Sequence, residues 1–553
     1  MFQSDIQPAG RHWSNWFRRP REPKEPNEVL ASYRRLKRSK FKLLLGLVGL
    51  MLFCFIYGFF FSLLVPSAFA FLMSPLAVLL LLVIWALPEA NWAPTQTLEW
   101  LFYASFIVLI VWPNYLAIAL PGLPWITLIR LTAFPLVLIL LSCISMSHDF
   151  RSALCTSLKG IAAVPVLLGI FVFVQFYSIA LSHDVSASIQ KFIVAQTTWT
   201  AMFFAAAYVF QKPGQIKRWS YLLWAMAVFV SLIAMWEYRL GRLPWVGHIP
   251  SFLKVDDDAV QAILEPHMRA YTDRYRAEAT FSTPLGLAEY LALTLPFILH
   301  FSTSRFPRRT RIAALISLPV VLYGDFLTNA KLGMIGAVAG SGFYIFTVAF
   351  NNWQRNKGSL IAGSALWFLP VGVGLFGGLM LASHRFQVLI FGNDGSHAAS
   401  TDTRVEQYRV GFQKFLQWPF GYGIGQGAAT IHPGETGRIT IDTYYLSVLL
   451  EYGIVGLIVY YGMFLIAIYE GVRRALFAPS NDENSSFLLP ITASLVVFII
   501  VKSVFSQQDN HPIVFMMLGA LVALVSSYRR TAMTQAARSA NMEIAYGAPA
   551  RSS

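Results

Sequence analysis

Residues 399–442 read ASTDTRVEQYRVGFQKFLQWPFGYGIGQGAATIHPGETGRITID, a polar segment between apolar runs at about 360–382 and 442–468. The segment collects arginines, carboxylates and glycines in a chain of 553 residues that is 56% hydrophobic and only 13% charged. Its mean hydropathy is +0.55. This composition excludes a soluble globular domain. We therefore expect a membrane protein whose chemistry lies in this polar segment.

Apolar runs long enough to cross a membrane recur along the whole chain. A hydrocarbon core of about 30 Å needs about 20 apolar residues per helix. The sequence predicts an all-α polytopic membrane protein of about 12–14 transmembrane helices, with the second run and the split at 329–332 as the least certain boundaries. The predicted spans are 42–64, 68–88, 98–120, 122–145, 160–182, 190–210, 219–237, 285–303, 311–329, 332–350, 360–382, 442–468, 487–503 and 511–527.

The distribution of Lys and Arg predicts the orientation, because short basic loops stay cytoplasmic. The segment Met1–Lys42 holds 11 Lys or Arg against four acids. We expect a cytoplasmic N-terminal tail at 1–41, a transmembrane domain at 42–528 and a cytoplasmic C-terminal tail at 529–553. Two long loops, about 238–284 and 383–441, then face the periplasmic side, and we expect short helices within them.

Several classes of function are disfavoured by the sequence. The three cysteines, Cys54, Cys143 and Cys155, form no disulfide or metal pattern, and no nucleotide-binding motif is present. We therefore expect no metal and no cofactor. The net charge of +15 is explained by anionic lipid headgroups without invoking nucleic acid.

The first long loop ends in RYRAEATFSTPLGLAEYLALTLPF, where Arg274 and Arg276 precede a span that opens at Pro284. The planar guanidinium of Arg276 suits a bidentate clamp on a lipid diphosphate, or the residue simply snorkels to the interface. Glu289 lies within the span, where a carboxylate faces a cavity or forms an ion pair. Lys331 is the matching cation, and it could complete a phosphate site with Arg276.

The second long loop supplies further candidates. The glycine run containing Gly423 and Gly425 could turn backbone amides toward an anion, although glycine-rich turns are common. Arg404 begins an amphipathic helix whose stripe of Val405, Tyr408, Phe412 and Phe415 is explained by packing. Arg438 is either solvated or meets an anionic substrate.

Asp442 stands at the mouth of the following span, where it either caps the helix or removes a proton from an attacking hydroxyl. His432 is a second candidate base. Near the end of the chain, Ser506–His511 form a polar cluster that is explained by a hydrated loop or by a glycan path.

In their order along the chain, four stretches resemble the O-antigen ligase and polymerase family of bacterial envelope enzymes. They are RAEATFSTPLGLAEYLALTLPF, LTNAKLGMIG, TDTRVEQYRVGFQKFLQWPFGYGIGQG and IDTYYLSVLLEYGIVG, and they cover about residues 270–465. The resemblance implies a metal-independent glycosyltransferase in the bacterial inner membrane. Its donor would be an undecaprenyl-diphosphate-linked oligosaccharide, transferred to an acceptor hydroxyl on the periplasmic face.

By the same resemblance, Arg276 and Lys331 would hold the diphosphate, Arg404 would support the loop and Asp442 would lie by the acceptor. Family ligases usually carry arginine at the position of Lys331 and a His-Asn pair at Asp442 and Thr443. These departures favour a polymerase that joins repeat units into an exopolysaccharide or related envelope polysaccharide. The alternatives are an O-antigen ligase that acts on lipid A-core and a flippase of the lipid-linked unit.

The expected partners follow from this interpretation. They are the lipid-linked donor, a growing polysaccharide or glycolipid acceptor, membrane lipids and a chain-length regulator.

Overall fold

The computed structural model describes residues 48–49, 51–52, 69–119, 125–268, 274–303, 305–358, 360, 363–364, 366–367, 370–372, 382, 395–432, 441–477 and 484–545. The chain divides into two units, Met1–Phe69 and Ala70–Ser553. Because the first unit contains very few described residues, the fold presented below is that of the second.

Helices account for nearly all of the secondary structure, as the sequence predicts. Within the described residues, eight helices are long and apolar enough to cross a membrane, or nine if one bent pair counts as a single span. The eight are α4 (Leu128–Met146), α7 with α8 (Val185–Val209), α9 (Gln215–Leu240), α11 (Pro284–Phe301), α12 (Arg308–Leu327), α13 (Lys331–Arg355), α18 (Tyr444–Phe477) and α20 (His511–Ala545). This chain is an all-α polytopic membrane protein.

The remaining helices are shorter or broken. In the bent pair, α5 (His148–Leu158) with η2 (Lys159–Ile161) meets α6 (Ala163–Ile179) at 100°. Inside the α7–α8 span, a π-helical turn, η3 (Gln196–Thr200), separates α7 (Val185–Ala195) from α8 (Ala201–Val209). Three further apolar helices are α2 (Phe69–Trp85), α3 (Thr95–Val111) and α19 (Leu488–Val501), the last preceded by η5 (Ser485–Phe487).

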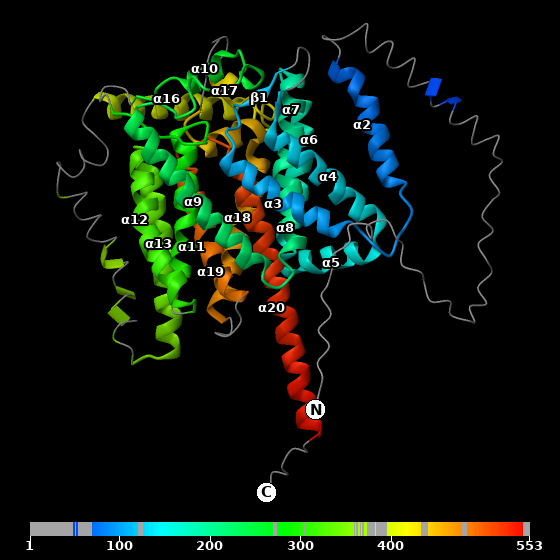
Figure 1. The fold of residues 1–553 in the computed structure, drawn as a ribbon, viewed down its shortest axis with the longest axis vertical. Coiled ribbons are helices and arrows are strands. Elements are labelled where there is room, and N and C mark those ends of the chain that lie inside the picture. The colour runs from blue at the N-terminus through cyan, green and yellow to red at the C-terminus, as the bar shows by residue number, and fades with distance from the viewer. Residues whose placement is uncertain are drawn as a thin grey trace, which may run out of the picture. The chain divides into compact units, whose positions relative to one another are not determined.

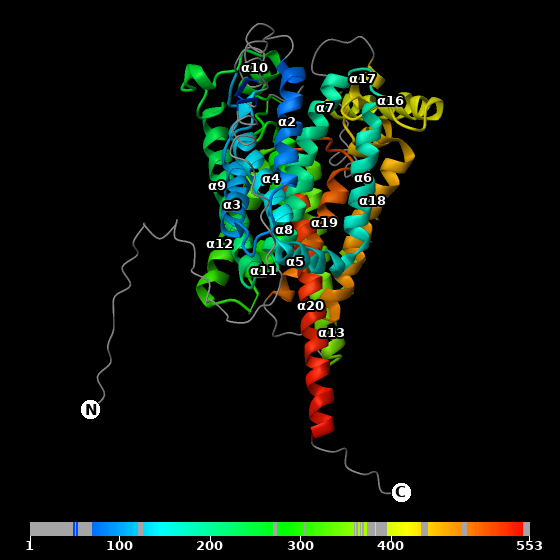
Figure 2. The same cartoon turned by 90° about the vertical axis from the view of Figure 1, so that its right-hand side faces the viewer.

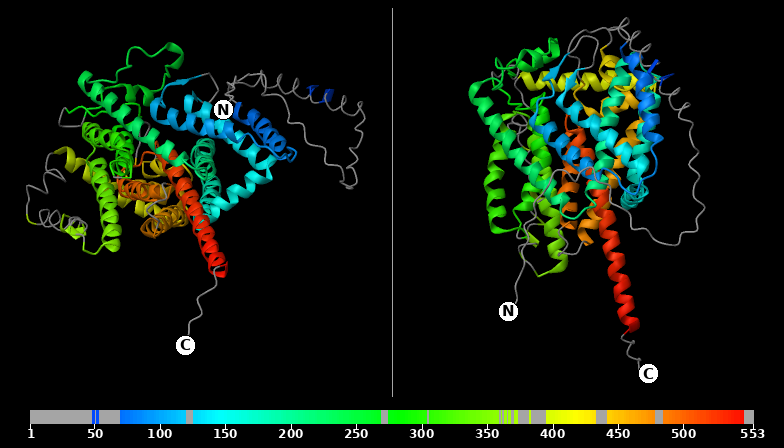
Figure 3. Two further views of the ribbon diagram at one scale, coloured as in Figure 1. Left: turned by 60° about the horizontal axis from the view of Figure 1, so that its bottom comes forward. Right: turned by 45° about the vertical axis from the view of Figure 1, so that its right-hand side comes forward.

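Each predicted span that lies in the described part of the chain coincides with a helix, whereas the runs at 42–64 and 360–382 lie largely outside it. Some boundaries differ. The helix α3 ends at Val111 instead of near 120, because Trp112 precedes Pro113 and adopts an extended conformation. The helix α20 continues to Ala545, well into the segment predicted as a tail, and its C-terminal part projects beyond the neighbouring helices (Figures 2 and 3).

The helix α11 lies at the centre of the bundle and packs against α9, α12, α13 and α19 (Figure 1). In its spanning window, 89% of the residues are buried. Small residues allow close approach here, as in many membrane bundles. A Cβ at Gly336 of α13 would lie 2.5 Å from a Val501 methyl, and one at Gly340 would lie 2.2 Å from a Val497 methyl. The Gly336–Gly340 spacing therefore sets how near α13 comes to α19.

Short elements gather at one end of the helices, which we call the loop face, marked by α10 (Asp258–Leu264), α16 (Gly395–Gln417) and α17 (Gly427–Ile431) (Figure 1). The predicted long loops thus do contain helices in their described parts. A two-residue antiparallel ladder joins β1 (Ala117–Ile118) to β2 (Ile126–Thr127). A small apolar cluster includes Tyr115, Leu243 and Val260, the last from α10, and β1 of the ladder also contacts η4 (Ser251–Leu253).

Gly453 interrupts α18 near the loop face. Its φ of 68° and ψ of −170° are non-helical and suit only glycine. A Cβ there would lie 2.3 Å from the carbonyl oxygen of Pro419. The break therefore creates the space in which the 419–425 segment docks against the helix.

We expect Gly453→Ala to destabilise the protein, because alanine adds both backbone strain of about 1–3 kcal/mol and a steric clash with Pro419. The matched control is Gly462→Ala in the same helix, where a Cβ would meet nothing within 4 Å. The measurement is the thermal unfolding midpoint of each purified variant in detergent. Equal midpoints for the two variants would contradict the role assigned to the break.

Candidate functional site

The segment that carries Arg274 and Arg276 is anchored by Glu237, a fully buried carboxylate near the end of α9. Its oxygens accept hydrogen bonds from the Tyr275 hydroxyl at 2.8 Å and from the Ala279 amide at 2.6 Å. Burial, and then the charge of Glu237, raise the pKa of the Tyr275 hydroxyl, so this group remains a donor. Ala279 has a φ of 50°, which is uncommon for a residue other than glycine. The contacts around this segment therefore hold its backbone in an unfavourable conformation.

Arg276 lies beside the turn between α12 and α13. Its Nε donates to the carbonyl of Thr328 at 3.1 Å, and the next amide, that of Ala277, donates to Leu327 at 3.1 Å. Lys331 is the first residue of α13, directly after this turn, in which Asn329 has a φ of 51°. The structure therefore brings Arg276 to the turn that precedes Lys331. Arg274 is exposed.

Glu289 forms a buried ion pair, but with Lys502 and not with Lys331. The distance from Lys502 Nζ to Glu289 Oε2 is 2.9 Å, and both side chains are completely buried. The Asn510 amide nitrogen donates to the Gly286 carbonyl at 2.8 Å and to Glu289 at 3.3 Å, and the Lys502 ammonium also donates to the carbonyl of Gln507. Lys502 was not predicted as a site residue, although a lysine within the apolar run ITASLVVFIIVK was a usable signal.

This ion pair belongs to a network that joins four helix ends at the loop face, those of α11, α18, α19 and α20. Ser282 lies just before α11, and Asp509 lies just before α20. The Ser282 hydroxyl donates a hydrogen bond to the Asp509 carboxylate at 2.6 Å. The carbonyl of Lys502, at the end of α19, accepts from the amide of Tyr444, the first residue of α18, at 3.1 Å. The segment with Arg276 and the residues around Asp442 are therefore held by one polar framework.

Asp442 and Arg404 form an ion pair on the loop face, with 3.3 Å between Arg404 Nε and Asp442 Oδ2. The exposed fractions of the two side chains are 34% for Arg404 and 30% for Asp442, so solvent reaches both. The Asp442 amide donates to Gln407 Oε1 at 2.9 Å. Asp442 is therefore held against α16 by two residues of that helix. Arg404 contacts its carboxylate, and Gln407 accepts from its backbone amide.

The helix α16 begins at Gly395, nine residues before the predicted start at Arg404. Packing does not explain the whole predicted stripe, because Val405, Tyr408 and Phe412 are exposed. The side that packs on α18 contains Gln407 and Gly411, where a Cβ on Gly411 would lie 2.8 Å from Leu446. Only Phe415 of the stripe joins the local apolar cluster. Periodicity identified the helix but not its buried side.

The glycine run does not present an open anion nest at Tyr422, Gly423 and Ile424, because their amides already donate within the protein. Tyr422 donates to the Leu450 carbonyl at 2.8 Å, Gly423 to Glu451 at 3.1 Å and Ile424 to Ser178 Oγ at 3.2 Å. Gly423 has a φ of 106°, and a Cβ there would lie 2.7 Å from Ser182. The run therefore docks the loop between α6 and the break in α18.

Gly425 continues this loop with a φ of 78°, and a Cβ there would approach the Lys191 side chain at 3.0 Å. His432 follows the last residue of α17 and is half-buried. Arg438 lies outside the described residues. In the part of the chain that is described, no group of three or more His, Cys, Asp or Glu residues could hold a metal ion.

The polar cluster at Ser506–His511 is more buried than a hydrated loop would be. Asn510 and His511 are completely buried. The His511 ring stacks on Trp199 with 4.7 Å between centroids and meets the edge of Tyr444 at 4.8 Å. Hydration is thus the wrong explanation for these two residues, which help to position the start of α20.

The comparison with protein families agrees with the expected resemblance. Residues 312–461 match the family described as O-Antigen ligase. The matched region contains Lys331, Arg404 and Asp442, whereas Arg276 and Glu289 precede it. No curated protein matches this chain.

We expect Lys502→Met to destabilise the protein by about 3–5 kcal/mol, because it leaves the Glu289 carboxylate buried without its partner. The control is the double variant Glu289→Gln/Lys502→Met, which removes both charges and should recover a large part of the loss. Thermal unfolding in detergent measures both. A double variant less stable than the single one would contradict the ion-pair explanation.

Proposed function

Because residues 312–461 match the O-antigen ligase family, we propose that this chain is a glycosyltransferase that polymerises lipid-linked repeat units. The donor is an oligosaccharide on undecaprenyl diphosphate, and the product is an exopolysaccharide or related envelope polysaccharide. The reaction takes place at the loop face, on the periplasmic side of the bacterial inner membrane. The observation that carries the proposal is the accessible Arg404–Asp442 pair within the matched domain.

The proposed step is a single displacement. The hydroxyl oxygen of the acceptor sugar forms a bond to the anomeric carbon of the donor, and the bond from that carbon to the diphosphate oxygen breaks. The electron pair of the broken bond leaves with undecaprenyl diphosphate. The Asp442 carboxylate accepts the hydroxyl proton, as a general base within hydrogen-bonding reach of an accessible substrate. Arg404 orients that carboxylate from 3.3 Å.

Arg276 and Lys331 are the proposed diphosphate ligands. The bond from Arg276 Nε to Thr328 fixes the plane of the guanidinium next to the turn that begins α13. Positive side chains that are already in place stabilise the charge that develops on the departing diphosphate. In this proposal they supply the charge that a divalent metal supplies in other transferases, so no metal is required.

Two substitutions relative to the ligase pattern support a polymerase over a lipid A-core ligase. Asp442 and Thr443 stand where ligases usually carry a His-Asn pair, and Lys331 stands where they carry arginine. A carboxylate accepts a proton but cannot act as an imidazole, and an ammonium is a point charge without the fork of a guanidinium. The proposed acceptor is therefore a growing polysaccharide chain, and a chain-length regulator is a further proposed partner.

We expect Asp442→Asn to leave the protein inserted and folded but to reduce transfer by about 10²–10⁴-fold, the usual contribution of a general base. Glycans and lipid carriers are extracted separately from cells that contain only the variant or lack the protein. Single repeat units on the outer-leaflet carrier, with no long polymer, would support the polymerase. Full-length polymer on the carrier would indicate a ligase, and units held in the inner leaflet would indicate a flippase.

We expect Arg276→Ala to raise the KM for the lipid-linked donor, because the proposed diphosphate clamp loses its charge. Arg239→Ala is the matched control, since Arg239 is an exposed arginine near the end of α9 at the same face. Transfer by the purified variants is measured at varied donor concentration. Equal effects at the two positions would contradict a specific role for Arg276.

A further inference from the structure

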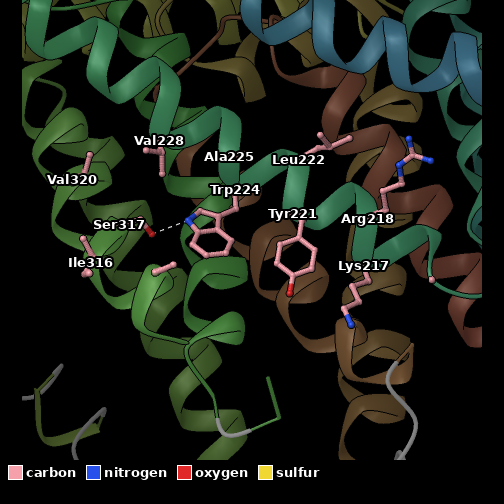
Figure 4. Close-up of a pocket in the computed structure, with 12 residues that line it drawn as sticks. Lys217, Arg218, Tyr221, Leu222, Trp224, Ala225, Val228, Ile316, Ser317 and Val320 are labelled. Carbon is pink, nitrogen blue, oxygen red and sulfur yellow. Dashed lines mark hydrogen bonds between the residues drawn. The ribbon is translucent and has the colours of Figure 1, made fainter. Parts of the chain in front are cut away.

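A groove of about 1020 Å³ lies between α9 and α12, away from the loop face (Figure 4). Its walls are mainly apolar, with Leu222 and Val228 from α9 and Ile316 and Val320 from α12. Two polar groups of the wall satisfy each other, since Trp224 Nε1 donates to Ser317 Oγ at 2.7 Å. The wall therefore suits a hydrocarbon chain better than a sugar.

The shape of the groove follows from one close contact between the two helices. A Cβ on Gly324 of α12 would lie 2.7 Å from the Ser231 hydroxyl of α9, so the helices touch at this point. From there they separate toward their N-terminal ends (Figure 1). The groove lies on this side of the contact, since its lining residues all precede Ser231 and Gly324, and exposed Ile316 places it at the side of the bundle, where a membrane protein meets lipid.

Cationic side chains lie at the end of the groove where both helices begin. Lys217 and Arg218 line the groove from the first turn of α9, and Arg218 is held over the Tyr103 ring at 4.8 Å. On α12, Arg309 precedes Ala313 by four residues and Ile316 by seven, so helical spacing places it on the groove side. No carboxylate is among the lining residues. Both helices also begin at this end, where their dipoles favour anions.

We propose that this groove binds an anionic phospholipid, with an acyl chain between α9 and α12 and its phosphate at Lys217, Arg218 and Arg309. Basic pockets between transmembrane helices are a recurrent site for anionic headgroups. The candidate transfer site uses the opposite ends of the same helices, at Glu237 and Thr328. The lipid site is therefore separate from the proposed reaction, and its leaflet is the one that the basic loops predict to be cytoplasmic.

Native mass spectrometry of the purified full chain tests the proposal with added phosphatidylglycerol or phosphatidylcholine. We expect phosphatidylglycerol to bind more tightly, and Lys217→Gln/Arg309→Gln to weaken it by at least about tenfold, given the usual contribution of each cation. The control Arg308→Gln/Arg311→Gln removes the same charge from positions that helical spacing turns away from the groove. It should leave the affinity within about twofold.

A second variant, Ala313→Trp, fills the groove without changing any charge and should also abolish phosphatidylglycerol binding. If the charge variant proves unstable by size-exclusion chromatography, the Ala313→Trp variant tests the binding of phosphatidylglycerol in the groove instead. Equal losses from the charge variant and its control, or equal binding of the two lipids, would overturn the proposal. So would competition by inorganic phosphate alone, or a co-purified protein that Ala313→Trp displaces.

Discussion

The interaction on which the loop face depends is the buried pair of Glu289 and Lys502. Removing two charges from water costs several kcal/mol per ion, and this cost is partly offset by the hydrogen bonds from Asn510 to Glu289 and from Lys502 to the Gln507 carbonyl. The same residues join the first turns of α11, the end of α19 and the start of α20. Through the carbonyl of Lys502 they also fix the first residue of α18.

The fold was predictable because a membrane imposes one dominant constraint. Every backbone polar group must be satisfied within the span, so apolar length alone predicts a helix. The turn around Asn329 was visible only as one of the least certain boundaries, because Asn329 and Lys331 alone interrupt the apolar stretch there. The break at Gly453 was not, because the surrounding EYGIVG reads as continuous apolar helix. Its cause is a tertiary contact, the approach of Pro419, and hydropathy contains no information about such contacts.

The candidate site was predictable as a set of residues but not as a set of contacts. Arg404 and Asp442 were each identified, yet only the packing of α16 on α18 brings them together. The glycine run was predicted to be either an anion nest or an ordinary turn, and its amides at 422–424 serve the docking of the loop. Glycine allows the backbone amides either to face an anion or to donate to another part of the protein. The sequence does not indicate which group will contact them. Lys502, Asn510 and His511 were missed or assigned to water because they lie at helix ends, where apolar length no longer separates buried from hydrated residues.

The Glu289–Lys502 and Arg404–Asp442 ion pairs differ in the property that decides what each can do. Glu289 and Lys502 are fully buried, so no acceptor hydroxyl reaches them, and their contribution is rigidity. Asp442 and Arg404 keep about a third of their surface, 30% and 34%, which leaves the carboxylate accessible to a sugar. Displacement at an anomeric carbon requires donor and acceptor to be held to within a fraction of an ångström. A reactive pair that must stay accessible cannot also be held by burial, so its precision has to come from neighbouring groups that are buried.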